Sequence, residues 1–260
     1  MKHLVTIDVE SVCRGRGDGH ADADPQLAPA LTALLDLLRQ HKTTATFFVL
    51  GADALAVRPV LAQALVDGHA IACHGDDHQR IDCIAPSSLP TVLRDARRRI
   101  EDIFQISCCG FRAPYFSVHS GMDCFFSGLA EAGFTYDASL RLPLGTPVAQ
   151  FTERFGIREI PVPLVRRGGM TLGVLGGLAL RVLPIWYICR LVDTCERAGQ
   201  PACIYLHPYE WYSRPEFSRI TMSEIRRTWL TARTLARLEL LLRCYQCAAL
   251  DEQPKRSVAP

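Results

Sequence analysis

Two segments that lie far apart in the chain carry side chains that could bind a divalent metal ion. In the first, Asp8 and Glu10 stand at the end of a short apolar run, and in the second, His74 and His78 follow another apolar run. Imidazoles four residues apart on a helical turn project from one face and can share one ion. A carboxylate would complete a set of three ligands that leaves positions open for water and substrate. The sequence therefore predicts metal-dependent hydrolysis.

Each of these patterns also has a simpler explanation. Carboxylates are common at strand ends, and a lone His-x-x-x-His pair is more often a solvated or capped turn than a metal site. The pair has Gly75 after its first histidine, so zinc proteases of the His-Glu-x-x-His type are disfavoured. The metal assignment therefore depends on what the rest of the chain supplies.

Composition and charge limit the class of protein. The chain has 260 residues, of which 48% are hydrophobic and 22% charged, and this is typical of a single domain with a sizeable core. A net charge of +2 is too small to indicate a nucleic-acid-binding surface. The eleven cysteines are an odd number, and no export signal precedes the first apolar run. We therefore predict free thiols and a cytoplasmic location.

One apolar stretch, residues 170–189, is a candidate for a membrane segment. Arg181 and Pro184 interrupt it, and the uninterrupted pieces are too short to span a bilayer. We predict instead a buried helix that begins near Pro184. The glycine-rich apolar loop before it could make a weak peripheral contact at the inner face of the membrane. No feature of the sequence indicates an oligomeric state.

Strand-like and helix-like segments alternate along the chain, as a mostly parallel α/β fold requires. Strands are predicted at 4–7, 44–50, 70–73, 110–115, 157–160 and 202–206, with a last one within 244–250, and helices at 25–40, 59–66, 88–104, 122–132, 184–198 and from 221 to about 242. We expect one catalytic domain over residues 1–250. The polar, proline-bearing segment 251–260 is predicted to be a disordered tail.

Five segments, read in order, resemble the motifs of the NodB-homology polysaccharide deacetylases, carbohydrate esterase family 4. They are Thr6–Glu10, His74-x-x-x-His78, Arg112–Tyr115, the region around Tyr136–Asp137, and Leu206–Pro208. The subgroup with Asp-Val-Glu in its first motif is the most similar, and the resemblance covers roughly residues 4–211. It implies a single-domain irregular (β/α) barrel with its site at the carboxyl ends of the strands. Independently of the family, every segment stands where a strand-like run ends.

The resemblance implies a role for each polar residue. Glu10, His74 and His78 would hold one divalent ion, with Zn²⁺ as the default and Co²⁺, Ni²⁺ or Mn²⁺ as alternatives. Asp8 would be the general base that activates water, and His207 the general acid that protonates the leaving amine. Because Asp8 and Glu10 lie at i and i+2 on one side of a strand, the sequence alone does not separate their roles.

Other motif residues would support this chemistry. The resemblance implies that Arg112 orients the base carboxylate, that Tyr115 contributes its backbone N–H to an oxyanion hole, and that Leu206 lines the pocket for a small acyl methyl group. Asp137 would orient His207 and raise its pKa. On the residues alone, Arg112 is also typical of a surface ion pair and Asp137 of a turn. Aromatic side chains at the mouth of the site would favour a sugar; the candidates are Tyr115, Phe116, Tyr209, Trp211 and Tyr212.

The second motif departs from the family pattern. The family usually has Ser or Thr after the first histidine, whereas this chain has Gly75 followed by Asp76 and Asp77. These carboxylates either contact the imidazoles from behind or face water.

Our first hypothesis for function is a metal-dependent hydrolase that removes an N-acyl group, above all acetyl, from an amino sugar. The substrate would be a glycan, a lipid-linked sugar or a related biosynthetic intermediate. One alternative is hydrolysis of a small linear or cyclic amide on the same fold. Another is a catalytically inactive sugar-binding relative, against which the complete set of Asp8, His74, His78 and His207 argues.

Overall fold

The computed structural model describes residues 1–10, 24–167, 170–173, 175–211 and 230–250. Its main feature is an eight-stranded parallel sheet with the strand order β10-β1-β2-β3-β4-β5-β7, in which β11 also pairs with β1. The strands are β1 (His3–Val9), β2 (Thr46–Val49), β3 (Ala70–Cys73), β4 (Gly110–Phe111), β5 (Tyr136–Asp137), β7 (Arg158–Glu159), β10 (Cys203–Leu206) and β11 (Cys247–Ala248). The first and last parts of the chain thus meet in one sheet.

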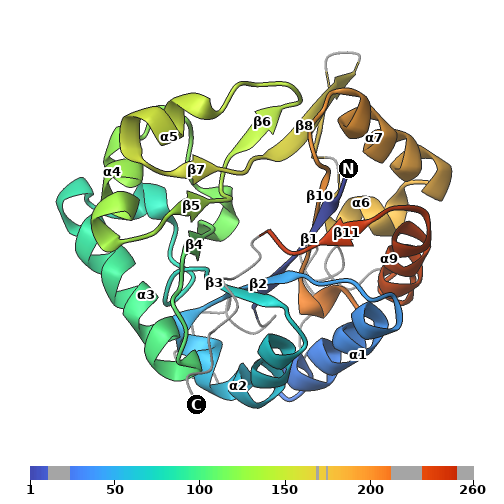
Figure 1. Cartoon of the computed structure of the whole chain (residues 1–260), viewed down its shortest axis with the longest axis horizontal. Coiled ribbons are helices and arrows are strands. Elements are labelled where there is room, and N and C mark those ends of the chain that lie inside the picture. Colours follow the sequence, from blue (N-terminus) through green and yellow to red (C-terminus); the bar gives the residue numbers. More distant parts are fainter. Residues whose placement is uncertain (11–23, 168–169, 174, 212–229, 251–260) are drawn as a thin grey trace, which may run out of the picture.

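Helices surround this sheet on its outer side, and the whole has the shape of an irregular (β/α) barrel (Figure 1). The α-helices are α1 (Leu27–Gln40), α2 (Gly51–Val66), α3 (Leu89–Phe104), α4 (Asp123–Ala132), α5 (Ala149–Phe155), α6 (Gly177–Val182), α7 (Ile185–Arg197) and α9 (Ala232–Cys244). Short 3₁₀ turns are η2 (Ile81–Cys83), η3 (Pro86–Ser88), η4 (Pro114–Phe116) and η5 (Pro208–Glu210). The predicted fold class is confirmed.

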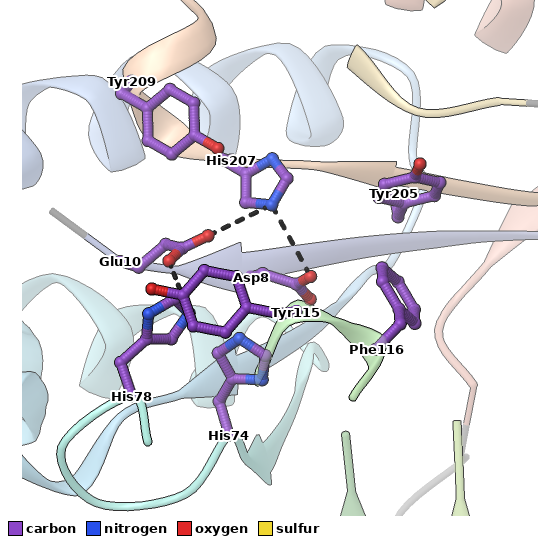
Figure 2. Close-up of a pocket in the computed structure, with 9 residues that line it drawn as sticks. All are labelled: Asp8, Glu10, His74, His78, Tyr115, Phe116, Tyr205, His207 and Tyr209. Atoms are coloured by element: carbon purple, nitrogen blue, oxygen red, sulfur yellow. Dashed lines mark ion pairs between the residues drawn. The ribbon is translucent and has the colours of Figure 1, made fainter. Parts of the chain in front are cut away.

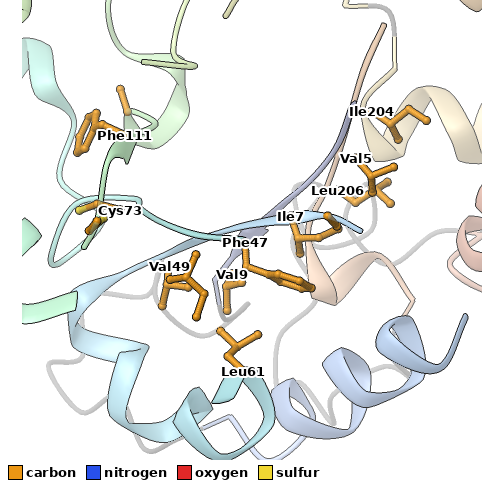
Figure 3. Packing of buried hydrophobic residues seen from close by; sticks show 14 of the residues in the cluster. Val5, Ile7, Val9, Phe47, Val49, Leu61, Cys73, Phe111, Ile204 and Leu206 are labelled. Carbon is orange, nitrogen blue, oxygen red and sulfur yellow. The ribbon is translucent and has the colours of Figure 1, made fainter. Parts of the chain in front are cut away.

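Alternation along the strands decides which side chains enter the barrel. In β1, the apolar residues Val5, Ile7 and Val9 belong to the main hydrophobic cluster, which they share with residues of the outer helices (Figure 3). Because successive side chains of a strand point to opposite faces, Thr6 and Asp8 point to the other side, into the barrel. The same alternation in the neighbouring strands fills the barrel with a smaller cluster that consists of Phe48, Ala72, Tyr136, Ala138 and Leu250.

The structure differs from the prediction in one helix and in one additional sheet. The second helix begins at Gly51 and not at Pro59, which lies inside it. The helix tolerates this proline because the carbonyl group that loses its partner belongs to Leu55, whose side chain is 71% exposed. A separate three-stranded sheet of β6 (Arg141–Pro143), β8 (Val162–Arg167) and β9 (Met170–Gly173) was not predicted.

Other predictions can be checked only in part. The last long helix covers Ala232–Cys244, whereas its predicted start at Thr221 and the predicted tail lie outside the described residues. The ten cysteines in the described part of the chain are all free. Within that part, no helix is both long and apolar enough to cross a membrane. The peripheral membrane contact stays a prediction.

Candidate active site

The carboxyl ends of β1, β3 and β10 meet at one pocket of about 230 Å³. Its lining includes five of the residues singled out from the sequence for metal binding or acid–base chemistry, together with four aromatic side chains (Figure 2). The complete lining is Asp8, Glu10, His74, His78, Tyr115, Phe116, Tyr205, His207 and Tyr209. Parallel strands end at the same edge of a sheet, so side chains from distant segments converge there.

Glu10, His74 and His78 form the cluster expected for a metal site. Each offers one ligand atom, and these atoms lie within 4.8 Å of one another. His78 Nε2 is 2.8 Å from Glu10 Oε2. His74 donates its Nδ1 proton to the backbone carbonyl of Arg112 at 2.8 Å, which leaves Nε2 as the nitrogen available to an ion. Burial lowers the pKa of His74, so this imidazole is neutral, as a ligand must be.

The two histidines are not on a helical turn, and that prediction was wrong. Residues 74–78 form a loop in which Gly75 has a φ of +84° and His78 a φ of +63°. The first amide groups of α2 hold this loop, because Gly51 and Ala52 donate their N–H groups to the carbonyls of Gly75 and Asp76. The ring centroids of the two histidines are nevertheless only 5.4 Å apart.

The additional carboxylates of the loop point away from the imidazoles. Asp76 pairs with Arg99 on α3 at 3.0 Å, and Asp77 accepts the backbone N–H of Gln79. Both side chains are thereby engaged at the outer edge of the loop. Of the two alternatives left open by the sequence, the structure supports the solvent-facing one.

Asp8 belongs to a buried ion pair at the floor of the pocket. Arg112 is completely buried and donates from Nη1 to Asp8 Oδ1 at 2.7 Å. The same guanidinium donates to the carbonyl of Ala138 and to Thr6 Oγ1, and it lies 4.1 Å from the ring of Phe48. Burial alone would raise the pKa of Asp8, but Arg112, His74 and His207 together outweigh burial and lower that pKa. The surface ion pair considered for Arg112 is therefore excluded.

His207 lies opposite the histidine loop and faces both carboxylates of β1. Its Nε2 is 3.1 Å from Glu10 Oε1 and 3.8 Å from Asp8 Oδ2. Burial alone would lower the pKa of His207, but Glu10, Glu210 and Asp8 together raise it to about 9. In turn, His207 and His78 outweigh the burial of Glu10 and lower its pKa to about 2. The site is thus a buried network of two carboxylates and several imidazoles.

Tyr115 lies at the rim of the pocket in a strained turn. Its φ is 58° and that of Phe116 is 51°, both in the left-handed region that L-residues rarely adopt. Its ring is 4.4 Å from that of His78 and half exposed. Within the described residues, no protein group accepts the amide N–H of Tyr115. This N–H is therefore available to a ligand.

Two residues predicted to contact substrate lie elsewhere. Leu206 is fully buried in the core, because alternation in β10 sends Ile204 and Leu206 outward and leaves Tyr205 as the pocket residue. Trp211 packs against the core and donates from Nε1 to the carbonyl of Ala30 on α1 at 2.9 Å. Applying the strand alternation to β10 would have found Tyr205.

Asp137 does not contact His207. Its Oδ1 accepts the hydroxyl of Ser139 at 2.6 Å, and that hydroxyl oxygen accepts the N–H of Ala113 at 2.7 Å. Burial raises the pKa of Asp137 to about 6, and it also raises the pKa of the nearby Glu159 carboxyl. The predicted role as orienter of His207 is thus wrong in geometry. Asp137 supports the segment that leads into the Tyr115 turn.

Two parts of the chain match models of known protein families. Residues 21–136 match the model of the polysaccharide deacetylase family, and residues 144–253 match a domain of unknown function, DUF3473. The first match includes the histidine pair and Arg112, whereas Asp8, Glu10 and His207 lie outside it. Over residues 21–136, which are somewhat less than half of the chain, the sequence is thus similar to the polysaccharide deacetylases.

Individual relatives agree with this family. The chitooligosaccharide deacetylase of Azorhizobium caulinodans is 34% identical over 94 residues, which are 34% of this chain and 42% of that protein. The curated relatives that match are aligned over only about two fifths of their length, 42% and 38%.

Solved structures show the fold. A Mycobacterium smegmatis protein assigned as a polysaccharide deacetylase superposes with a TM-score of 0.62 at 16% identity, over 95% of this chain and 87% of that chain. A family 4 carbohydrate esterase from Streptomyces lividans, in complex with acetate, gives 0.55 at 15% identity, over 100% and 97%. A family 4 pseudoenzyme from Bacillus anthracis gives 0.50 at 13% identity, over 97% and 65%, so the fold alone does not establish activity.

Proposed function

We propose that this protein is a metal-dependent hydrolase that removes an N-acyl group, above all acetyl, from an amino sugar. The observation that carries the proposal is the pocket itself. One cavity brings Asp8 and Glu10 of the first motif within reach of His207 on one side, while Glu10 also contacts His78 on the other. This is the arrangement that a metal-assisted hydrolysis with a separate base and acid requires.

Glu10, His74 and His78 are proposed as the metal ligands. Two imidazole nitrogens and one carboxylate oxygen suit Zn²⁺, and also Co²⁺, Ni²⁺ or Mn²⁺. The fit is supported by the carbonyl of Arg112, which fixes the ring orientation of His74. A divalent ion bound there would polarise the acyl carbonyl and lower the pKa of a water molecule.

Asp8 is proposed as the general base and His207 as the general acid. The ion pair with Arg112 keeps the Asp8 carboxylate charged and in one orientation, so it can accept a proton from water. In the metal-free protein, Glu10, Glu210 and Asp8 favour the protonated form of His207 by raising its pKa to about 9, and its Nε2 faces the pocket. That proton can pass to the departing amine. The free N–H of Tyr115 would stabilise the oxyanion.

The aromatic lining supports a sugar as the group that carries the amide. Tyr115, Phe116, Tyr205 and Tyr209 line the pocket, and flat apolar faces of this kind suit sugar rings. A small linear or cyclic amide would need fewer of these rings. The location predicted from the sequence, the cytoplasm or the inner face of the membrane, stays a prediction.

Activity and metal content test the proposal together. The protein is loaded with Zn²⁺, and acetate release is measured from N-acetylated chitooligosaccharides and from small amides, with bound zinc determined by elemental analysis. We expect about one ion per chain, and both ion and activity should be lost in His74→Ala and His78→Ala. The matched control is His119→Ala, because His119 is exposed and does not line the pocket.

Two further variants separate the carboxylates. Glu10→Gln should weaken zinc retention, whereas Asp8→Asn should retain zinc and lose activity, because the amide cannot accept a proton. If Asp8→Asn instead loses zinc and Glu10→Gln retains it, Asp8 is the metal ligand and Glu10 the general base. Undiminished zinc in both histidine variants would refute the metal site. Zinc binding and sugar binding without acetate release would support the inactive relative instead.

A further inference from the structure

A second carboxylate stands behind His207, on the side away from the pocket. Glu210 is the last residue of η5 and is 97% buried, with only 3% of its surface exposed. Its Oε2 accepts the backbone N–H of His207 at 3.1 Å, and its Oε1 is 3.6 Å from Nδ1 of the same imidazole. This Nδ1 is buried, and among the described residues Glu210 is the charged group that faces it.

The surroundings of Glu210 hold its carboxylate in this position. Arg181 on α6 is 2% exposed, and its Nη2 lies 3.6 Å from Glu210 Oε1. A β-carbon at Gly177 would come within 1.7 Å of Glu210 Oε2, so only glycine leaves room for the carboxylate there. From α9, Thr234 donates its hydroxyl to the backbone carbonyl of Glu210 at 2.7 Å. Two helices therefore hold Glu210, α6 at its side chain and α9 at its backbone.

We propose that Glu210, held in place by Arg181, is the positioning residue of His207, the part that resemblance had given to Asp137. Nδ1 is buried without a hydrogen-bond partner among the described residues, and Glu210 Oε1 at 3.6 Å is the acceptor toward which an Nδ1–H would point while Nε2 faces the pocket. Residues 144–253, the segment matched by the domain of unknown function, contain His207 and the residues around it, namely Gly177, Arg181, Glu210 and Thr234. A task of that segment is thus to complete and support the histidine side of the site.

The inference rests on the proposed deacetylase function, but one test does not need activity. In the zinc-loaded protein labelled with ¹⁵N-histidine, the ring resonances of His207 are assigned by their loss in His207→Gln. We expect a protonated Nδ1 whose signal is displaced in Glu210→Gln and unchanged in Asp137→Asn. An unprotonated Nδ1 in the wild-type protein would overturn the proposal, and so would displacement by the Asp137 variant alone.

Kinetics distinguish positioning from a merely structural role. Glu210→Gln should lower kcat for the amide substrate by about 10-fold or more, at unchanged zinc content, and by less than the loss of about 10²–10⁴-fold expected for His207→Ala. Added to His207→Ala, the same substitution should leave the residual rate unchanged, because the residue that it positions is already gone. Glu210→Asp, which keeps the charge, should restore part of the rate.

Each kinetic outcome decides a different point. An equal loss from Glu210→Gln in the presence and absence of His207 would show a structural role and overturn the proposal, as would an unchanged kcat. If the wild-type protein releases acetate from no amide or glycan, the proposed function fails. The NMR measurement then still decides whether Glu210 positions His207.

Discussion

The buried ion pair between Asp8 and Arg112 should couple the stability of the fold to the site. Both side chains are almost completely buried, and their closest atoms are 2.7 Å apart. For two unit charges about 4 Å apart and an effective dielectric constant of about 20, Coulomb's law gives about 4 kcal/mol. Removal of one partner from a buried pair typically costs about 3–5 kcal/mol, because the other charge remains uncompensated. We therefore expect Asp8→Asn and Arg112→Met each to lower the free energy of unfolding by several kcal/mol.

A double-mutant cycle measures this coupling. The free energy of unfolding in urea at pH 7 is compared for the wild type, both single variants and the double variant, all in the metal-free form. The double variant should be more stable than the sum of the single losses predicts, by about 2–3 kcal/mol. The exposed pair Asp123–Arg154 is the control, for which the coupling should not exceed about 1 kcal/mol. Additive losses at the buried pair would refute the reasoning.

Other perturbations address the remaining parts of the site. Burial raises the pKa of Asp137 to about 6, so the folded state binds this proton more tightly than the unfolded chain. The free energy of unfolding should therefore fall as the pH rises from about 4 through 6. Urea unfolding of Asp137→Asn should show a smaller fall. His207→Ala should retain zinc, but its rate of amide hydrolysis should fall by about 10²–10⁴-fold. The rate of ester hydrolysis should fall less, because an alcohol needs less protonation to leave. Equal losses would contradict the assignment of His207 as the general acid. Tyr209→Ala should raise KM for an oligosaccharide, since the Tyr209 ring stacks on that of His207 at the pocket. Trp211→Phe should lower the free energy of unfolding by about 1 kcal/mol and leave KM unchanged, because it removes the hydrogen bond to Ala30.

The positions of the reactive groups could be predicted because each follows a strand. Asp8, Glu10, His74 and His207 stand in or directly after short apolar runs, and parallel strands place their carboxyl ends at one edge. The direction of a side chain within such a run is also predictable in principle from alternation. The motif alone indicates Leu206 as a pocket residue, but Ile204, two residues before it, marks the core side of the same strand.

The contacts between distant loops could not be predicted in this way. The conformation of the histidine loop depends on the amides at the start of α2, more than twenty residues earlier in the chain. The partner of Asp137 is Ser139, and nothing in the local sequence says that their contact turns away from His207. Glu210 is only three residues from His207, yet its function as a partner requires the space at Gly177 and the charge of Arg181. Contacts of this kind depend on tertiary packing between distant segments of the chain.

The strand order explains why both halves of the chain are needed for one site. β1 is the strand that pairs with β10 on one side and β2 on the other, so its two carboxylates stand between His207 and the histidine loop. Buried carboxylates in such numbers would repel each other without compensation. Arg112 compensates Asp8 from inside the barrel, His207 compensates Glu10, and Arg181 balances Glu210 behind His207. Each carboxylate thus has a basic partner from a distant segment of the chain, and the charge balance of the pocket depends on the closure of the whole fold.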